Sequence, residues 1–206
     1  MSVHSTDQVD PPANGSEPRV SKRRADAERN LSRIIEAATA LLAVNPRASM
    51  AEIAEASGLV RATLYRHFPT REELLRAIYS AALQDALSAI LAVEPDRGRA
   101  TDAIARVVDA LLVVGDRYRI LNAERRDYPE LREQEESVGA PLIALVERGQ
   151  RDGELRADLP LRWLVAALGS LVTEALRAVA REDIGRGEAG ALVTRTFLES
   201  MRPHGR

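Results

Sequence analysis

The residues with the clearest chemical potential lie together in one short segment, residues 61–67, which reads RATLYRH. Arg61 and Arg66 carry guanidinium groups, which bind phosphate and can bind guanine through two parallel hydrogen bonds. Tyr65 adds a hydroxyl group, and Ala62 adds a methyl group that can touch the methyl of thymine. On a helix these four side chains share one broad arc. The arc has the chemistry of a surface that binds double-stranded DNA, with phosphate or base as the target of either arginine.

Two short helices joined by a glycine turn would position this arc. Ser49 and Glu52 have the spacing of a capping box, which predicts the start of the first short helix. Gly58 can adopt the positive φ that a tight turn needs, and Pro69 ends the second helix. The segment 49–67 therefore has the form of a helix-turn-helix. The same pattern would also suit a three-helix cap in which these residues are ordinary surface.

The rest of the chain predicts only helices. Aromatic residues make up 3% of the chain and apolar residues 45%, and the abundant Ala, Leu, Arg and Glu are strong helix formers. Apolar residues recur at spacings of three and four, and no segment shows the period-two alternation of a strand. We expect an all-α fold of about nine helices. The clearest ranges are approximately 31–45, 49–57, 60–67, 70–92, 101–118, 140–151, 160–181 and 188–201.

Residues 51–75, AEIAEASGLVRATLYRHFPTREELL, resemble the signature of the TetR family of transcriptional regulators. The matching positions are Ile53-Ala54, Gly58, Thr63-Leu64-Tyr65, His67-Phe68 and Glu72 to Leu75. The C-terminal two-thirds of the chain has no motif of this specificity and is similar to the family only in its layout of helices.

The resemblance implies roles for individual residues. Thr63, Tyr65 and His67 would contact phosphates or the edge of the groove. Ser49 would cap its helix and could donate to a phosphate, and Arg71 stands where a lysine usually meets the DNA backbone. The chain departs from the family at two further positions. Val60 replaces the usual serine cap, which costs about 1 kcal/mol unless Ser57 or a backbone group compensates, and Ala62 replaces a frequent glycine.

The C-terminal part is expected to bind a small molecule and to form a homodimer, as the resemblance implies. The helix at 101–118 presents an apolar wall that turns polar at one end, as a ligand cavity needs. The candidate ligand-binding residues, for each of which core packing is the alternative, are Leu111, Gly115, Tyr118, Arg119, Asn122 and Trp163. The last two helices would form a four-helix bundle across a two-fold axis. The candidate interface residues are Leu168, Leu171, Ala175, Leu176, Leu192, Val193, Phe197 and Leu198.

The distribution of charge along the chain supports a division into a DNA-binding part and a second domain. The net charge is −2, yet residues 19–71 carry ten Lys and Arg against five Asp and Glu. A basic segment joined to an acidic remainder is typical of a DNA-binding module fused to a different domain. We expect a disordered tail at 1–21, a helix-turn-helix domain at 22–69, and a ligand-binding and dimerisation domain at 70–206, within which 70–92 is the linking helix.

Composition argues against other classes of function. The chain has no cysteine and three histidines, and we expect no enzyme activity, no cofactor and no metal. The longest apolar stretch, 163–172, is about half the length needed to cross a bilayer, so a cytoplasmic protein is expected. The sequence predicts a repressor released from a palindromic operator by a small-molecule effector. The alternatives are a DNA-binding dimer that acts without a ligand, as an architectural factor or activator, and a helical enzyme or adaptor with degenerate DNA binding.

Overall fold

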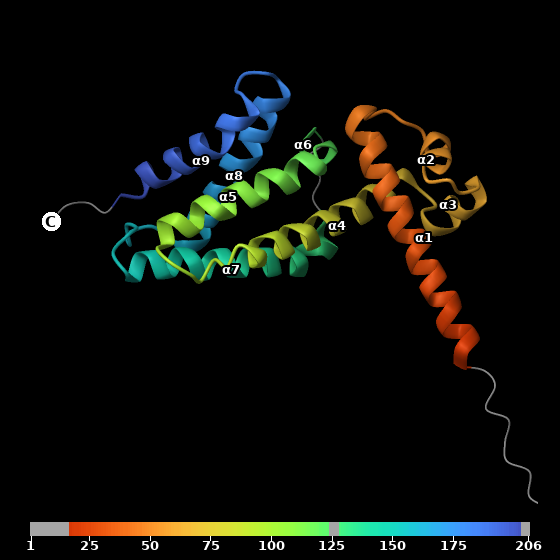
Figure 1. The fold of residues 1–206 in the computed structure, drawn as a ribbon, viewed down its shortest axis with the longest axis horizontal. Coiled ribbons are helices and arrows are strands. Elements are labelled where there is room, and N and C mark those ends of the chain that lie inside the picture. Colours follow the sequence, from red (N-terminus) through yellow and green to blue (C-terminus); the bar gives the residue numbers. More distant parts are fainter. Residues whose placement is uncertain (1–16, 124–127, 203–206) are drawn as a thin grey trace, which may run out of the picture.

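The computed structural model describes residues 17–123 and 128–202, which form nine α-helices and one short 3₁₀ turn and contain no strand. The elements are α1 (Glu17–Val44), α2 (Met50–Ala56), α3 (Arg61–His67), α4 (Arg71–Ala92), α5 (Ala100–Arg117), α6 (Ile120–Ala123), η1 (Pro129–Leu131), α7 (Arg132–Arg151), α8 (Leu161–Ala180) and α9 (Arg186–Ser200). The helices form two lobes, and α4 runs from the lobe of α1–α3 into the lobe of α5 and α7–α9 (Figure 1). The predicted all-α fold is confirmed.

The N-terminal lobe is held by apolar side chains from all of its helices. Ile34 and Leu42 of α1, Ile53 of α2 and Leu64 of α3 are each 0% exposed. Full burial of one such side chain contributes roughly 1.5–3 kcal/mol. The apolar stripe predicted on the first helix therefore packs in one core with the buried side chains of α2 and α3.

The C-terminal lobe has a separate core. It is built from the inward faces of α5, α7, α8 and α9 with Ile90 at the end of α4. Glu154, in the turn after α7, closes this core at the start of α5. Its carboxylate accepts hydrogen bonds from the backbone N–H of Ala100 at 3.2 Å and of Thr101 at 3.1 Å. A side chain distant in sequence thus caps a helix that lacks a cap of its own.

The two lobes share side chains, so the division at residue 69 is not a boundary between cores. Leu74, Leu75 and Ile78 of α4 are buried with α1–α3, and so are Tyr118 and Ile120 from the end of α5 and the start of α6. The segment that ends α5 therefore belongs to the N-terminal core although it lies some 50 residues further along the chain. Any movement of this segment must disturb both lobes.

Some predicted boundaries are wrong. Helix α1 begins at Glu17, within the predicted tail, and residues 1–16 lie outside the described residues. Helix α7 begins at Arg132, eight residues before its predicted start. Its first turns are rich in Glu, which is stabilised at a helix N-terminus and leaves no apolar periodicity to detect. The short α6 was not predicted.

Two helices, α4 and α8, are long and apolar enough to cross a membrane by length and composition. Each of them packs against neighbouring helices: α4 lies against α5 and α7, and α8 lies against α7 and α9. Core helices of helical proteins meet the same criterion of length and hydropathy, so this property does not distinguish a membrane protein here.

Candidate DNA-binding surface and ligand cavity

The predicted capping box opens α2. The backbone N–H of Ser49 donates to Glu52 Oε2 at 2.7 Å, and the N–H of Glu52 donates to Ser49 Oγ at 3.3 Å. The Ser49 hydroxyl also donates to the Glu52 carboxylate at 2.7 Å, and these hydrogen bonds hold the pKa of Glu52 below its usual value. Ser49 is exposed at the end of the loop, but its one hydroxyl proton is donated to Glu52, so in this arrangement it does not donate to a phosphate as the sequence predicts.

The turn between α2 and α3 has the geometry that the sequence predicts. Gly58 has a φ of +66°, a conformation that residues with a Cβ rarely adopt. Arg33 on α1 supports the turn, because its Nη2 donates to the carbonyl oxygen of Ser57 at 3.0 Å. The hydroxyl of Ser57 donates to the carbonyl of Ala54, so it does not cap α3. Helix α3 therefore starts at Arg61, after the N-cap residue Val60, with no side-chain cap.

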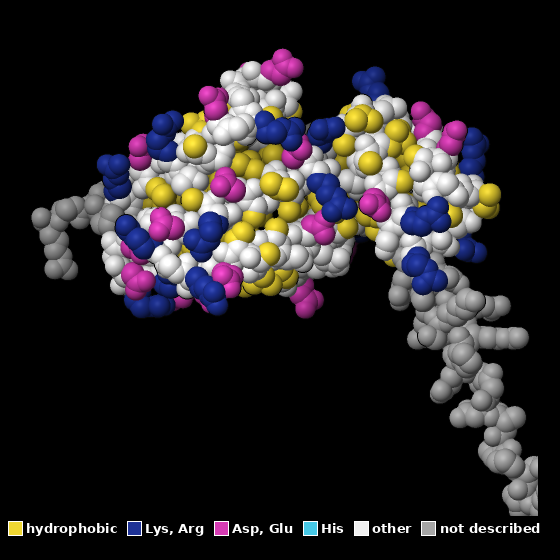
Figure 2. Space-filling model, in the orientation of Figure 1, with side chains coloured by type: hydrophobic (Ala, Val, Ile, Leu, Met, Phe, Trp, Pro, Cys, Tyr) yellow, Lys and Arg dark blue, Asp and Glu magenta, His cyan; other side chains and the backbone are white. Residues whose placement is uncertain are grey.

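Helix α3 presents the predicted arc to solvent. Arg61, Ala62 and Arg66 are exposed, and 46% of Tyr65 is exposed. Within the described residues, neither arginine has a hydrogen bond or an ion pair. Arg side chains are spread over this lobe in the face that Figure 2 shows. Val60, the N-cap residue of α3, is 71% exposed, and Leu64 is the buried residue of this helix.

Three other predicted DNA contacts have different surroundings. Thr63 is half-buried beside Leu64. His67 is half-buried, and its Nε2 atom is buried without a hydrogen-bond partner among the described residues, so this atom faces the protein and is not available to a phosphate. Arg71 donates from Nη1 to the carbonyl oxygen of Ala48 and from Nη2 to that of Pro46, at 2.5 and 2.7 Å. Two of its five N–H donors thus hold the loop before α2, and its contact with a phosphate stays a prediction for the others.

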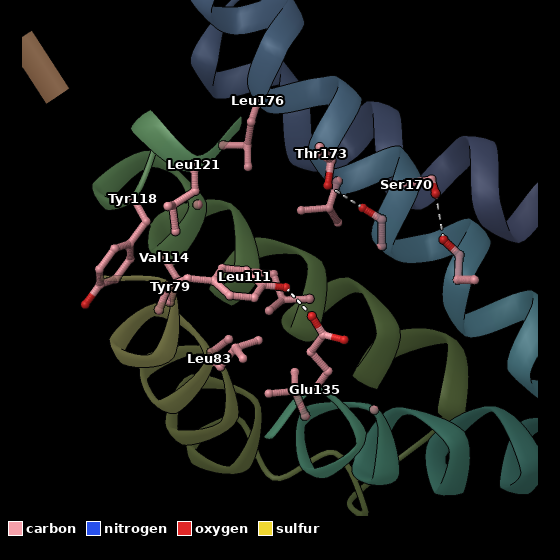
Figure 3. Close-up of a pocket in the computed structure, with 18 of the residues that line it drawn as sticks. Tyr79, Leu83, Leu111, Val114, Tyr118, Leu121, Glu135, Ser170, Thr173 and Leu176 are labelled. Carbon is pink, nitrogen blue, oxygen red and sulfur yellow. Dashed lines mark hydrogen bonds between the residues drawn. The ribbon is translucent and has the colours of Figure 1, made fainter. Parts of the chain in front are cut away.

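A cavity of about 1120 Å³ lies in the C-terminal lobe between α4, α5, α7 and α8 (Figure 3). Its walls are mainly aliphatic, and Leu83, Leu111, Val114 and Leu121 point into it in the close-up view. This volume suits a small organic molecule. Three predicted ligand residues, Leu111, Gly115 and Tyr118, line it.

The other predicted ligand residues do not. Arg119 points to the N-terminal lobe, where its Nε donates to the carbonyl oxygen of Ala43 at 2.8 Å. Trp163 is 66% exposed on the outside of α8, because the opposite face of that helix carries Leu164 and Leu168 into the core. Asn122 falls in α6, and its side chain lies outside the described residues.

Gly115 lines the cavity as predicted, and it also lies against Leu176 of α8. A Cβ added at this position would overlap Cδ1 of Leu176, so the Leu176 side chain occupies the space that the missing side chain leaves. Leu176 in turn lines the cavity, whereas the sequence placed it in a dimer interface. The space beside the cavity is instead found at Gly139 on α7, where an added Cβ would meet nothing within 4 Å.

Apart from Tyr118, the polar groups of the cavity were missed from the sequence. Tyr79 on α4 donates a hydrogen bond to Glu135 Oε1 on α7 at 2.6 Å, and its ring centroid lies 5.5 Å from that of Tyr128. Tyr118 donates to Asp85 at 2.8 Å, and burial together with this hydrogen bond raises the pKa of Tyr118 to about 12. Three of the four tyrosines of the chain line the cavity, which in a sequence so poor in aromatic residues was the available signal.

The predicted interface residues divide into two groups. Leu168, Ala175, Val193 and Phe197 are at most 6% exposed and pack in the core of their own chain, so they are not available to a partner. Leu171 and Leu198 are partly buried, and Leu192 is 36% exposed. With Trp163, the more exposed residues leave apolar surface on the outer sides of α8 and α9.

Comparison with known protein sequences gives matches that include the helix-turn-helix segment. The family model described as "Bacterial regulatory proteins, tetR family" matches residues 34–78, from the middle of α1 into α4. The HTH-type transcriptional repressor LfrR of Mycolicibacterium smegmatis is 36% identical over 88 residues, which are 43% of this chain. The matched region spans 47% of LfrR, about half the length of that relative.

Solved structures match over most of the chain. LfrR from Mycobacterium smegmatis in complex with proflavine has a TM-score of 0.70 at 24% identity, covering 86% of this chain and 99% of LfrR. FadR from Bacillus subtilis in complex with stearoyl-CoA has a TM-score of 0.70 at 17% identity, covering 83% and 99%. At these identities the likeness establishes the fold, including the arrangement of both lobes.

Proposed function

Because this chain belongs to the TetR family of bacterial regulatory proteins, we propose that it is a cytoplasmic, homodimeric repressor that leaves its operator when a small molecule fills the cavity. The proposal has three parts: DNA is bound by α3, two chains pair through α8 and α9, and the cavity controls the distance between the two α3 helices. Each part rests on a different set of residues.

The surface of α3 carries the DNA-binding part. Arg61 and Arg66 are exposed on a short helix that follows a glycine turn. Neither forms an ion pair or a hydrogen bond with another described residue. An arginine held in this way can make two hydrogen bonds to guanine, while the Tyr65 hydroxyl can donate to a phosphate beside it. This outward arc is the single observation on which the proposal depends most.

Dimerisation follows from the length of α3. A helix of seven residues reads only a few base pairs, so two copies are needed for a useful affinity, and they would read an inverted repeat. The apolar surface left by Trp163 and Leu192, with the partly buried Leu171 and Leu198 beside it, supports pairing through α8 and α9.

Three residues support control of DNA binding by the cavity. Leu75, Tyr118 and Ile120 line the cavity and are also buried in the N-terminal core. A ligand that displaces them must shift α4 or the end of α5 relative to α1, since packed cores move between discrete arrangements. To release DNA tenfold, the ligand needs only about 1.4 kcal/mol of preference for the non-binding state. The complexes of LfrR with proflavine and of FadR with stearoyl-CoA support a ligand site in this fold.

Selection of DNA from a randomised library tests the proposal. The full chain should enrich an inverted repeat. Arg61→Ala should lose the preference at one base pair in each half-site, at a cost of about 1–3 kcal/mol. Tyr65→Phe should weaken binding evenly, because a phosphate contact positions the protein and does not read sequence.

Arg97→Ala provides the control, because it removes the same charge from the turn after α4, far from α3. Its selected sequence should be that of the wild type. An unchanged sequence preference in Arg61→Ala would exclude Arg61 as the residue that reads the base.

A further inference from the structure

Val60 is an apolar side chain on the part of the molecule that is proposed to meet DNA. It directly precedes Arg61, and most of its side chain is exposed. Within the described residues it does not pack against the N-terminal core, whereas its neighbour Leu59 does. The two apolar residues that lead into α3 therefore differ: Leu59 stabilises the lobe, and Val60 faces solvent.

The backbone conformation of Val60 explains why its side chain is exposed. A helical residue four positions before Leu64 would share the buried face of that leucine. Val60 has a φ of −69° and a ψ of 145°, which are the angles of extended chain, so it is the N-cap and does not follow the helical projection of α3. Its isopropyl group is thus left in solvent beside the exposed Arg61.

Valine is an unfavourable residue at this position in the free protein. The serine that is usual here in the family would accept a hydrogen bond from a backbone N–H of the first turn, and valine cannot do so. Within the described residues no side chain caps α3, whereas Ser49 caps α2 and Thr70 caps α4. Because Val60 neither caps the helix nor packs in the core, its side chain is suited to a contact that forms only in a complex.

The exposure of Val113, on the outer side of α5, has no such consequence. Valine and serine have similar propensities inside a helix, so a polar residue there would gain little. Single exposed apolar residues of this kind are common on protein surfaces. Val60 differs because it occupies an N-cap position and because it adjoins an arginine that has no partner among the described residues.

Double-stranded DNA offers an apolar group that fits an isopropyl side chain beside an arginine. In the major groove thymine presents its C5 methyl group, by which it differs from the other three bases. Consecutive Cα atoms are about 3.8 Å apart, and neighbouring base pairs are about 3.4 Å apart. Adjacent residues at the start of a recognition helix can therefore meet adjacent base pairs.

We propose that Val60 contacts the C5 methyl group of a thymine in each half-site, next to the base pair that Arg61 reads. The inference rests on the proposed function, since it specifies one base of the operator. The contact would bury apolar surface that both partners expose when they are apart, which is favourable. The charge of this region also suits DNA, because Arg61 and Arg66 are exposed and the first turn of α3 has no acidic residue.

Replacement of thymine by uracil tests the contact, because it removes the methyl group and keeps the hydrogen-bonding groups of the base. The full chain first selects its inverted repeat from a randomised library. Each thymine of the half-site is then replaced in turn by deoxyuridine, in both half-sites together. The wild type should lose about tenfold in affinity at one thymine, and this thymine should adjoin the base pair for which Arg61→Ala loses its preference.

Val60→Ser removes the isopropyl group and supplies a capping hydroxyl. Its melting temperature should equal or exceed that of the wild type, so a change in its DNA preference cannot come from unfolding. It should bind the thymine and uracil operators with affinities within about twofold of each other. The repeat that it selects should keep the base read by Arg61 and lose the preference for the adjacent thymine.

Val113→Ser is the matched control, because it makes the same change at a similarly exposed valine of the C-terminal lobe that does not line the cavity. It should select the wild-type repeat and respond to uracil as the wild type does. A wild-type repeat without the adjacent thymine, or a Val60→Ser variant that still loses tenfold with uracil, overturns the inference. A uracil effect that persists in Val60→Ser and disappears in Ala62→Gly assigns the methyl contact to Ala62 and also overturns it.

Operator release separates this inference from the proposed function. If Val60→Ser loses the thymine preference but no ligand of the cavity releases the operator, the proposed repressor function fails and the thymine contact stands. If a cavity ligand releases the operator but Val60→Ser selects the wild-type repeat, the thymine contact fails and the proposed function stands. A chain that selects no repeat overturns both.

Discussion

Arg119 Nε donates a hydrogen bond to the carbonyl oxygen of Ala43 at 2.8 Å, and so joins the segment between α5 and α6 to the end of α1. Tyr118, its neighbour, lines the cavity and is buried in the N-terminal core. The two residues together form a short mechanical link from the ligand site to the DNA-binding lobe.

Arg119→Met should weaken this link while keeping the aliphatic stem of the side chain. Loss of one hydrogen bond of about 1 kcal/mol should reduce the effect of the effector on operator affinity by about fivefold. Operator affinity measured with and without effector checks the ratio. Arg106→Met is the control, because Arg106 also donates to backbone carbonyls, those of Val93, Glu94 and Arg97, but wholly within the C-terminal lobe. An equal loss of response in both variants would show that Arg119 acts only through stability.

Gly139→Leu should block the cavity without disturbing the fold. Position 139 borders the cavity, an added Cβ there meets nothing within 4 Å, and the replacement of a helical glycine adds up to about 1 kcal/mol of helix propensity. The variant should bind operator normally and fail to release it, as a non-inducible repressor. Gly115→Leu should instead lower the melting temperature, because its side chain collides with Leu176. Normal induction in a folded Gly139→Leu protein would place the effector elsewhere.

Trp163→Glu combined with Leu192→Glu should give folded monomers. Both side chains are exposed in the single chain, so the charges cost little until a partner would bury them. Sedimentation measures the mass, and circular dichroism measures the helix content. Val44→Glu, a similar change at the 73% exposed end of α1, should remain a dimer. Phe197→Glu is unsuitable, because Phe197 is 1% exposed in the core of its own lobe. A double variant that sediments as a dimer would place the interface on another surface.

Glu154→Gln should lower the free energy of unfolding by about 1 kcal/mol, since it weakens the cap of α5. Burial raises the pKa of Glu154, but hydrogen bonds from Thr101 and Ala100 and the charge of Arg99 outweigh it, and the pKa lies below its usual value of 4.5. A lowered pKa stabilises the fold above about pH 4.5 and ceases to do so as the pH falls through the folded-state value. The difference between wild type and variant should therefore be constant near neutral pH and shrink below pH 4.5 in urea titrations. Glu147→Gln, at an exposed pair with Arg151, should change little.

The helix-turn-helix was predictable because its signals are local. The capping box at Ser49 and Glu52 and the positive φ of Gly58 depend on residues within a few positions of each other. The register of α8 was not predictable, because that helix is apolar on nearly every side. Only the packed structure shows that Leu168 faces inward and Trp163 outward.

The cavity was only partly predictable for a related reason. Leu111 and Tyr118 follow from the stripe on α5, whereas Tyr79 and Glu135 are 56 residues apart and meet through the packing of α4 against α7. Gly115 illustrates the limit of periodicity: the pattern located it at the cavity, but its contact with Leu176 on α8 depends on the packing of two helices.

Release of the operator as a function of cavity occupancy tests the account most directly. A ligand is first chosen from a panel of compounds by the rise in melting temperature it gives to the wild type and not to Gly139→Leu. That ligand is then titrated into the wild-type protein bound to its selected inverted repeat, and occupancy and DNA binding are followed together. We predict that the operator dissociates in proportion to occupancy and that Gly139→Leu stays bound throughout. An operator that remains bound when the cavity is saturated would contradict the account.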